Sequence, residues 1–270
     1  MLVGASIALG VVLHPLQFGM VQLLEGYWGV GVWQQRLRAW AIQRHRRRRE
    51  ALLAAAGTAN RAFKRADLIP EERRRERETV ANLSVQHEAD RLFNQYPILP
   101  HEVMPTRLGN MLRRYETAPG RPIGADLPAL VPLLAAVAPP EQIDYVNDQR
   151  SALDLAVRTV MLSFAATLFS VLLLWNDGLW LLVALLPYLA TYLSYRGCVI
   201  CAESYGSALG TLLMLNRFRL YEQLHLALPA NMYQELRSNK LLTAVFRHFE
   251  VPEPRKSMKY QHPPTEPSQT

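Results

Sequence analysis

The apolar residues of this chain are gathered into long stretches, and the longest of them lies between Arg158 and Arg196. It holds thirty-seven residues with one charge, Asp177, and a turn signal at 176–178 divides it into halves of seventeen residues. Each half would extend about 25 Å as a helix, close to the roughly 30 Å hydrocarbon core of a bilayer. The pattern predicts a transmembrane helical hairpin over residues 159–195. Two buried helices of a soluble core are the alternative.

A second apolar segment, residues 1–33, contains no lysine or arginine. A cleaved signal peptide needs positive residues before its apolar core, so this segment is expected to stay in the membrane. Residues 2–22 would cross it, with a kink at Pro15. A re-entrant or in-plane amphipathic helix is the alternative, because glutamines and glycines make the segment less apolar than the hairpin. Its ionisable groups, His14 and Glu25, are candidate intramembrane functional residues.

The polar remainder of the chain also reads as helix, with no competing strand pattern. Residues 34–158 are expected to form a basic helical cytoplasmic domain, whose first helix, 34–56, continues directly from the membrane segment. Residues 196–250 would pack on that domain as further helices, and the proline-rich residues 251–270 would form a disordered tail. The expected fold class is an all-α polytopic membrane protein with about three spans. The helices predicted after the first are 71–96, 107–116, 126–139, 141–175, 179–226 and 229–250.

Charge gives this arrangement an orientation. All thirty lysines and arginines lie in 36–158, which has twenty-one, and in 196–259, which has nine. The positive-inside rule then puts both stretches in the cytoplasm and the turn at 176–178 outside, in a multi-pass protein of the cell membrane. Nucleic acid is not an expected partner, because no recognition motif accompanies the charge. Seven arginines lie between Arg36 and Arg49 with no acidic residue among them, and this arginine run is expected either to bind anionic inner-leaflet lipid or to act only as a topology signal. Its proposed lipid-binding residues are Arg44, Arg46, Arg47, Arg48 and Arg49.

Three short phrases resemble segments of a family of uncharacterised actinobacterial integral membrane proteins. They are His-Pro-Leu-Gln-Phe at 14–18 leading to Leu-Glu-Gly-Tyr-Trp-Gly at 24–29, Pro-Thr-Arg-Leu-Gly-Asn at 105–110 with Leu-Arg at 112–113, and Arg-Phe at 217–218 through Leu-Tyr-Glu at 220–222 to Leu-His-Leu at 224–226. The resemblance implies a membrane protein. It implies no activity and no cofactor.

Enzymatic motifs are missing from the sequence: there is no phosphate-binding loop, no nucleophile elbow and no paired-histidine zinc motif. Cys198 and Cys201 share a helix face, but zinc needs four ligands and no further cysteine or paired histidine supplies them. We therefore expect no enzyme activity, no cofactor and no metal site.

Small residues recur on the two long helices near the cytoplasmic end of the hairpin. Antiparallel pairing about Asp177 would bring Ala156 near Cys198 and Ala152 near Ala202, and the ridge would continue through Gly206 and Gly210. Such ridges allow two helix backbones to approach closely. The alternative is that the glycines only loosen or end the helix.

The function expected from the sequence is a non-enzymatic integral membrane protein whose cytoplasmic helices mediate protein or self association at the inner leaflet. The alternative is a small channel or transporter subunit assembled as an oligomer.

Overall fold

The structure is a computed structural model that describes residues 17–66, 93–248 and 260–261. The regular elements in this part of the chain are helices, with one isolated antiparallel bridge between Leu226 and Tyr260. The predicted all-α class is therefore confirmed there. The chain divides into two compact units: Met1–Arg114 with Asp154–Ala202, and Tyr115–Leu153 with Glu203–Thr270. The boundaries between these units fall inside helices.

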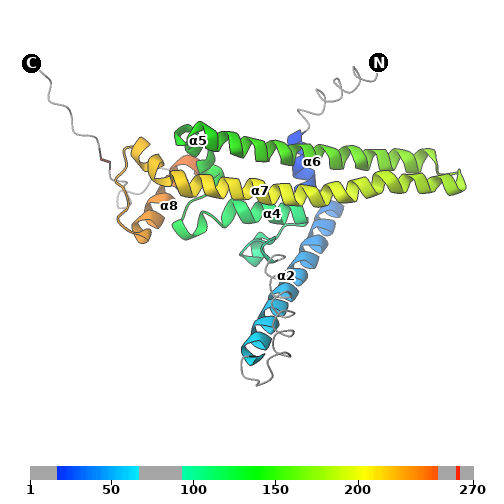
Figure 1. Cartoon of the computed structure of the whole chain (residues 1–270), viewed down its shortest axis with the longest axis horizontal. Coiled ribbons are helices and arrows are strands. Elements are labelled where there is room, and N and C mark those ends of the chain that lie inside the picture. The colour runs from blue at the N-terminus through cyan, green and yellow to red at the C-terminus, as the bar shows by residue number, and fades with distance from the viewer. Residues whose placement is uncertain (1–16, 67–92, 249–259, 262–270) are drawn as a thin grey trace, which may run out of the picture. The chain divides into compact units, whose positions relative to one another are not determined.

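Two long helices form the predicted hairpin. Helix α6 spans Pro140–Leu173, and α7 spans Leu185–Gln223 after the short helix η3, Gly178–Ala184 (Figure 1). Both arms are long and apolar enough to cross a membrane, and a bent pair, Arg107–Ile123 with Leu127–Val137, would make a third span if counted as one. Only 11% of the apolar stretch of α6 is buried. Most of this apolar stretch is therefore left uncovered by the rest of the described chain.

The second arm of the hairpin corrects one expectation, because residues 178–184 form a 3-10 helix and the α-helix begins only at Leu185. Pro187 favours this late start. It has no backbone N–H to donate to the carbonyl of Val183, so an α-helix that began further upstream would lose a hydrogen bond here. Proline is tolerated in the first turn, which is where it stands in α7.

The first unit also contains α2, Val32–Ala66, the 3-10 helix η1, Pro100–Glu102, and most of α4, Arg107–Thr117. Residues 17–25 are helical, and the chain then turns at Gly26 before α2 begins. The expectation that α2 continues directly from the membrane segment is therefore wrong. Within this unit α2 crosses the direction of α6 and α7 rather than running along them (Figure 1). The predicted helix 71–96 falls mostly outside the described residues.

The second unit packs α5, Leu127–Val137, and α8, Met232–His248, around the end of α7, with the 3-10 helix η2, Arg121–Ile123, beside them. Two polar side chains are bound in its core: the hydroxyl of Tyr221 donates to Asn239 Oδ1 at 2.7 Å, and Asn239 Nδ2 donates to the carbonyl of Ile123 at 2.9 Å. Of the predicted tail, Tyr260 and Gln261 are described, and the N–H of Gln261 donates to the carbonyl of His225. The buried core residues are Ile123, Ala125, Leu127, Leu130, Leu134, Leu212, Leu213, Leu220, Tyr221, Leu226 and Leu242.

Candidate functional site

The start of α4 is assembled from segments that are far apart in the sequence. The hydroxyl of Thr106 accepts the N–H of Gly109 at 2.9 Å, which is the geometry of a helix N-cap. The same hydroxyl donates to the backbone carbonyl of Glu25 at 2.9 Å. Asn110 holds the preceding loop, because its side chain accepts from the N–H and donates to the carbonyl of Met104 at 2.8 Å each. The turn after Glu25 is thus fastened to the cap of α4.

Two glycines allow this close approach. Gly26 has φ +106°, a conformation that residues with a side chain rarely adopt, and a Cβ there would overlap the ring of Pro105. A Cβ on Gly109 would overlap the carbonyl oxygen of Glu25. The sequence segments 24–29 and 105–110, two of those that carry the family resemblance, therefore contact each other here. Gly26 and Gly109 are the residues that let the two backbones approach.

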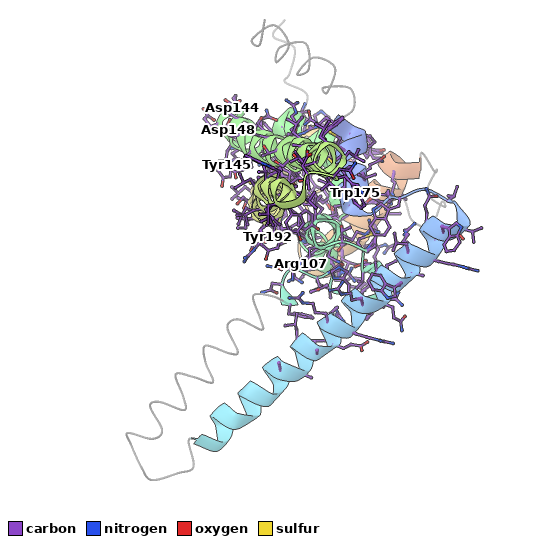
Figure 2. All side chains as sticks on the ribbon, turned by 90° about the vertical axis from the view of Figure 1, so that its right-hand side faces the viewer. Arg107, Asp144, Tyr145, Asp148, Trp175 and Tyr192 are labelled. Atoms are coloured by element: carbon purple, nitrogen blue, oxygen red, sulfur yellow. The ribbon has the colours of Figure 1, made fainter. Side chains whose placement is uncertain are left out.

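The apolar hairpin of α6 and α7 contacts the same region. The backbone N–H of Leu108 donates to the hydroxyl of Tyr195 at 3.4 Å, at the start of α4. Arg158 donates to the side-chain oxygen of Gln17. Arg158 directly precedes the first uncharged segment of the hairpin, and Tyr195 is the last residue of the second. The contacts with α4 and Gln17 therefore lie where the uncharged segments meet charged sequence. Trp175, beside the turn of the hairpin, and Tyr192, one helical turn before Tyr195, are more than half exposed, at 71% and 51% (Figure 2).

Two arginines of α2, Arg46 and Arg49, lie on the face that packs against residues 97–100, which we call the inner face. Arg49 is buried and donates to the carbonyls of Pro97 and Ile98 at 3.3 and 2.6 Å. Arg46 donates to the carbonyl of Pro100 at 3.1 Å. The lipid-binding role expected for Arg49 is therefore wrong, because its guanidinium is occupied inside the protein and shielded from a membrane surface.

His45 lies on the same inner face, beside a buried tyrosine. Its Nδ1 is 3.0 Å from the hydroxyl of Tyr96, and the two rings are 5.8 Å apart. Burial lowers the pKa of His45 from 6.5 to about 4, assisted by the positive charges of Arg107, Arg48 and Arg44. Burial also raises the pKa of Tyr96. At neutral pH the pair is therefore an uncharged hydrogen-bonded contact within a cationic region.

The outer face of α2 carries the rest of the arginine run together with large apolar side chains. Trp33, Leu37 and Trp40 recur at the i, i+4, i+7 spacing of one helix face, and they are 81%, 54% and 60% exposed. This stripe was not among the features expected from the sequence, although the spacing of its three residues is visible there. The exposed arginines of α2 in this stretch are Arg36, Arg44, Arg47 and Arg48.

The ionisable pair of the first segment is placed only in part. His14 lies outside the described residues. Glu25 is half-buried, and its backbone carbonyl accepts the Thr106 hydroxyl described above. The structure therefore gives the backbone at Glu25 a role in fixing α4.

The small-residue ridge of α7 is covered, but not in the way expected. Cys198, Ala202, Gly206 and Gly210 are buried, whereas Ala152 is exposed, so a packing role for Ala152 is wrong. The buried positions of α6 in this region carry Leu153, Val157 and Val160 instead, and Ala156 is half-buried. A Cβ on Gly206 would overlap the ring of Tyr115, and one on Gly210 would lie 3.2 Å from the ring of Pro119.

The ridge is thus covered at these two positions by the last turn of α4, which carries Tyr115, and by Pro119 just after it. The pairing rule about Asp177 considered only α6 as a neighbour for α7. It could not have revealed a third segment packing against the glycines.

The thiols and other metal-ligating groups do not gather into a site in the described part of the chain. Both Cys198, which is buried, and Cys201, which is half-buried, are free. No group of three or more histidine, cysteine, aspartate or glutamate side chains there could hold a metal ion.

Comparison with known proteins returned no match: no family model, no curated protein and no solved structure is similar to this chain.

Proposed function

We propose that this protein is a non-enzymatic integral protein of the cell membrane whose cytoplasmic helices mediate protein or self association at the inner leaflet. The observation that carries the proposal is an uncovered apolar face on α7 beyond the uncharged hairpin segments. Met214, Leu215 and Phe218 lie on that face and are 38%, 61% and 42% exposed. The opposite face of the same helix packs into the core of its unit through Leu213 and Leu220.

Charged neighbours argue that a protein, rather than lipid, covers this apolar face. Arg217 forms an ion pair with Glu235 of α8 at 3.3 Å, and its guanidinium lies 4.8 Å from the ring centre of Phe218. Arg219 and Glu222 are exposed on the same turns. Burying these charges in hydrocarbon would be costly. An aqueous apolar patch with a charged rim is typical of protein interfaces.

A mass measurement tests the association. We expect the full chain in lipid nanodiscs to form an oligomer or to retain a partner after purification, and Leu215→Lys to weaken that association. Gln223→Lys is the matched control, because it adds the same charge at an exposed polar position of the same helix. A wild-type chain that is monomeric and free of partners at all concentrations would refute the proposal.

The orientation within this proposal has its own test. In a background with Cys198 and Cys201 replaced by alanine, Asp177→Cys should react with an impermeant thiol reagent added to intact cells. Lys240→Cys, an exposed position of α8, should react only after the membrane is opened. The native cysteines are poor probes, since buried Cys198 would stay unreactive on either side.

The channel or transporter alternative makes a different prediction. Proteoliposomes of the full chain would then conduct ions or transport a solute, and changing His14 or Glu25 would abolish the flux. An impermeable proteoliposome agrees with the association proposal.

A further inference from the structure

The outer face of α2 combines two features. One is the stripe of Trp33, Leu37 and Trp40. A tryptophan contributes 150–250 Å² of mostly apolar surface when it is buried, so this stripe leaves a large apolar area uncovered. The other is positive charge: between Val32 and Arg49 the helix carries no aspartate or glutamate.

Arginine and tryptophan are arranged to act together on this face. The guanidinium of Arg36 lies 5.7 Å from the ring centre of Trp33, and that of Arg44 lies 5.7 Å from the ring centre of Trp40. Long cationic side chains can keep the charge in water or headgroups while their stems cover apolar surface. Arg46 and Arg49 face the other way, onto backbone carbonyls. The helix is therefore divided into an internally bonded face and an amphipathic cationic face.

The position of α2 in its unit favours a lipid surface over a soluble acidic partner. The same unit contains the apolar arms of the hairpin, and the α2 turn carrying Arg49 is bonded to residues just before η1 and α4. The start of α4 in turn contacts Tyr195, the residue before Arg196, where the uncharged segment ends. Amphipathic helices with tryptophan on one side and arginine around it settle at the boundary between headgroups and acyl chains.

We propose that residues 32–48 of α2 lie in the plane of the inner leaflet and bind anionic phospholipid. Trp33, Leu37 and Trp40 enter the headgroup–acyl boundary. The exposed arginines contact lipid phosphates, and these are Arg36, Arg44, Arg47 and Arg48 rather than the whole run. This inference rests on the proposed membrane location, but it is independent of the association surface on α7.

A spin label tests it in the full chain. The label is attached to Leu37→Cys in a background with alanine at Cys198 and Cys201, and the protein is reconstituted in liposomes of phosphatidylcholine alone or with phosphatidylglycerol. With anionic lipid, the label should collide with oxygen more than with a water-soluble nickel reagent. A label on Lys240→Cys should remain accessible to water in both lipids.

Single charge removals identify the arginines involved. Arg47→Gln should reduce the ratio of lipid-embedded to water-exposed label about fivefold, the effect expected for one basic side chain at an anionic surface. Arg219→Gln, which removes one exposed arginine from α7, should leave this ratio unchanged, and added salt should lower it.

Three results would overturn the assignment. The first is a label at position 37 that stays fully water-accessible with anionic lipid. The second is a label immobilised without lipid collisions, which means that protein covers the face. The third is a label at position 37 that, in neutral liposomes, becomes less accessible to the nickel reagent when RNA is added. Each of these results can be obtained whether or not the apolar face of α7 that carries Leu215 forms an oligomer. This inference and the association proposal can therefore fail separately.

Discussion

Replacing Gly109 with alanine should destabilise the protein although the residue lies inside a helix. On helix propensity alone the change would stabilise α4 by about 1 kcal/mol, because glycine is a poor helix former. The structure predicts the opposite sign. The added Cβ would overlap the backbone carbonyl oxygen of Glu25 and would lie 3.0 Å from Thr106 Oγ1.

The expected magnitude follows from what has to move. A backbone atom cannot turn aside as a flexible side chain can, so the turn after Glu25 must shift away from α4. Overpacking of this kind costs about 1–3 kcal/mol, and separating Thr106 from the Glu25 carbonyl removes a hydrogen bond worth about 1 kcal/mol. After subtraction of the propensity gain, Gly109→Ala should lower the free energy of unfolding by about 1–3 kcal/mol.

A second glycine in a helix supplies the control. Gly197 lies in α7, and a Cβ built there meets no heavy atom within 4 Å. Gly197→Ala should therefore stabilise the protein by about 0.5–1 kcal/mol. Both variants would be compared with wild type by titration with SDS in mixed micelles, monitored by tryptophan fluorescence. If Gly109→Ala were as stable as Gly197→Ala, the docking of the Glu25 turn on α4 would be incorrect.

Three further outcomes are expected. Gly206→Ala should lower the thermal melting temperature because the added Cβ overlaps the ring of Tyr115. Ser207→Ala, at an exposed position of the same helix, should change the melting temperature little. Equal melting temperatures for the two variants would contradict the covered ridge. Tyr221→Phe should cost about 1–3 kcal/mol in SDS titration by leaving buried Asn239 Oδ1 without its donor, and a neutral result would mean that this hydrogen bond is absent. The pKa of His45 is lowered from 6.5 to about 4 in the folded protein, so as the pH falls the unfolded chain binds this proton before the folded chain does. The stability of the protein should therefore be unaffected by His45 above pH 6.5 and should decline as the pH falls toward 4. His45→Gln should flatten that part of the stability profile, and an NMR titration of His45 near pH 6.5 would show that the side chain is not buried.

Much of the helical framework could be predicted because it depends on local sequence. The uncharged segments on either side of Asp177 are long, apolar and separated by a turn signal, and helices α6 and α7 follow from them. The caps are also local: Thr106 stands three residues before Gly109, a spacing at which a hydroxyl can bond the first turn. Pro187, which favours the late start of α7, is also visible in the sequence.

Which individual side chains are buried or make contacts could be learned only from the tertiary structure. Arg44 and Arg49 belong to one run of basic residues, yet the first is exposed and the second is buried against carbonyls about fifty residues further along the chain. Ala152 and Gly206 were both expected to be packing positions of the small-residue ridge, yet one is exposed and the other is covered by Tyr115.

The sequence by itself determined that this chain forms long helices, where two of them are apolar enough to cross a membrane, and where its positive charge is concentrated. Those properties depend on residues that are neighbours along the chain. Which face of each helix is covered depends on segments that arrive from elsewhere, and only the tertiary structure decided it. For α2, covering of the Arg49 face left Trp33 and Trp40 on the exposed side.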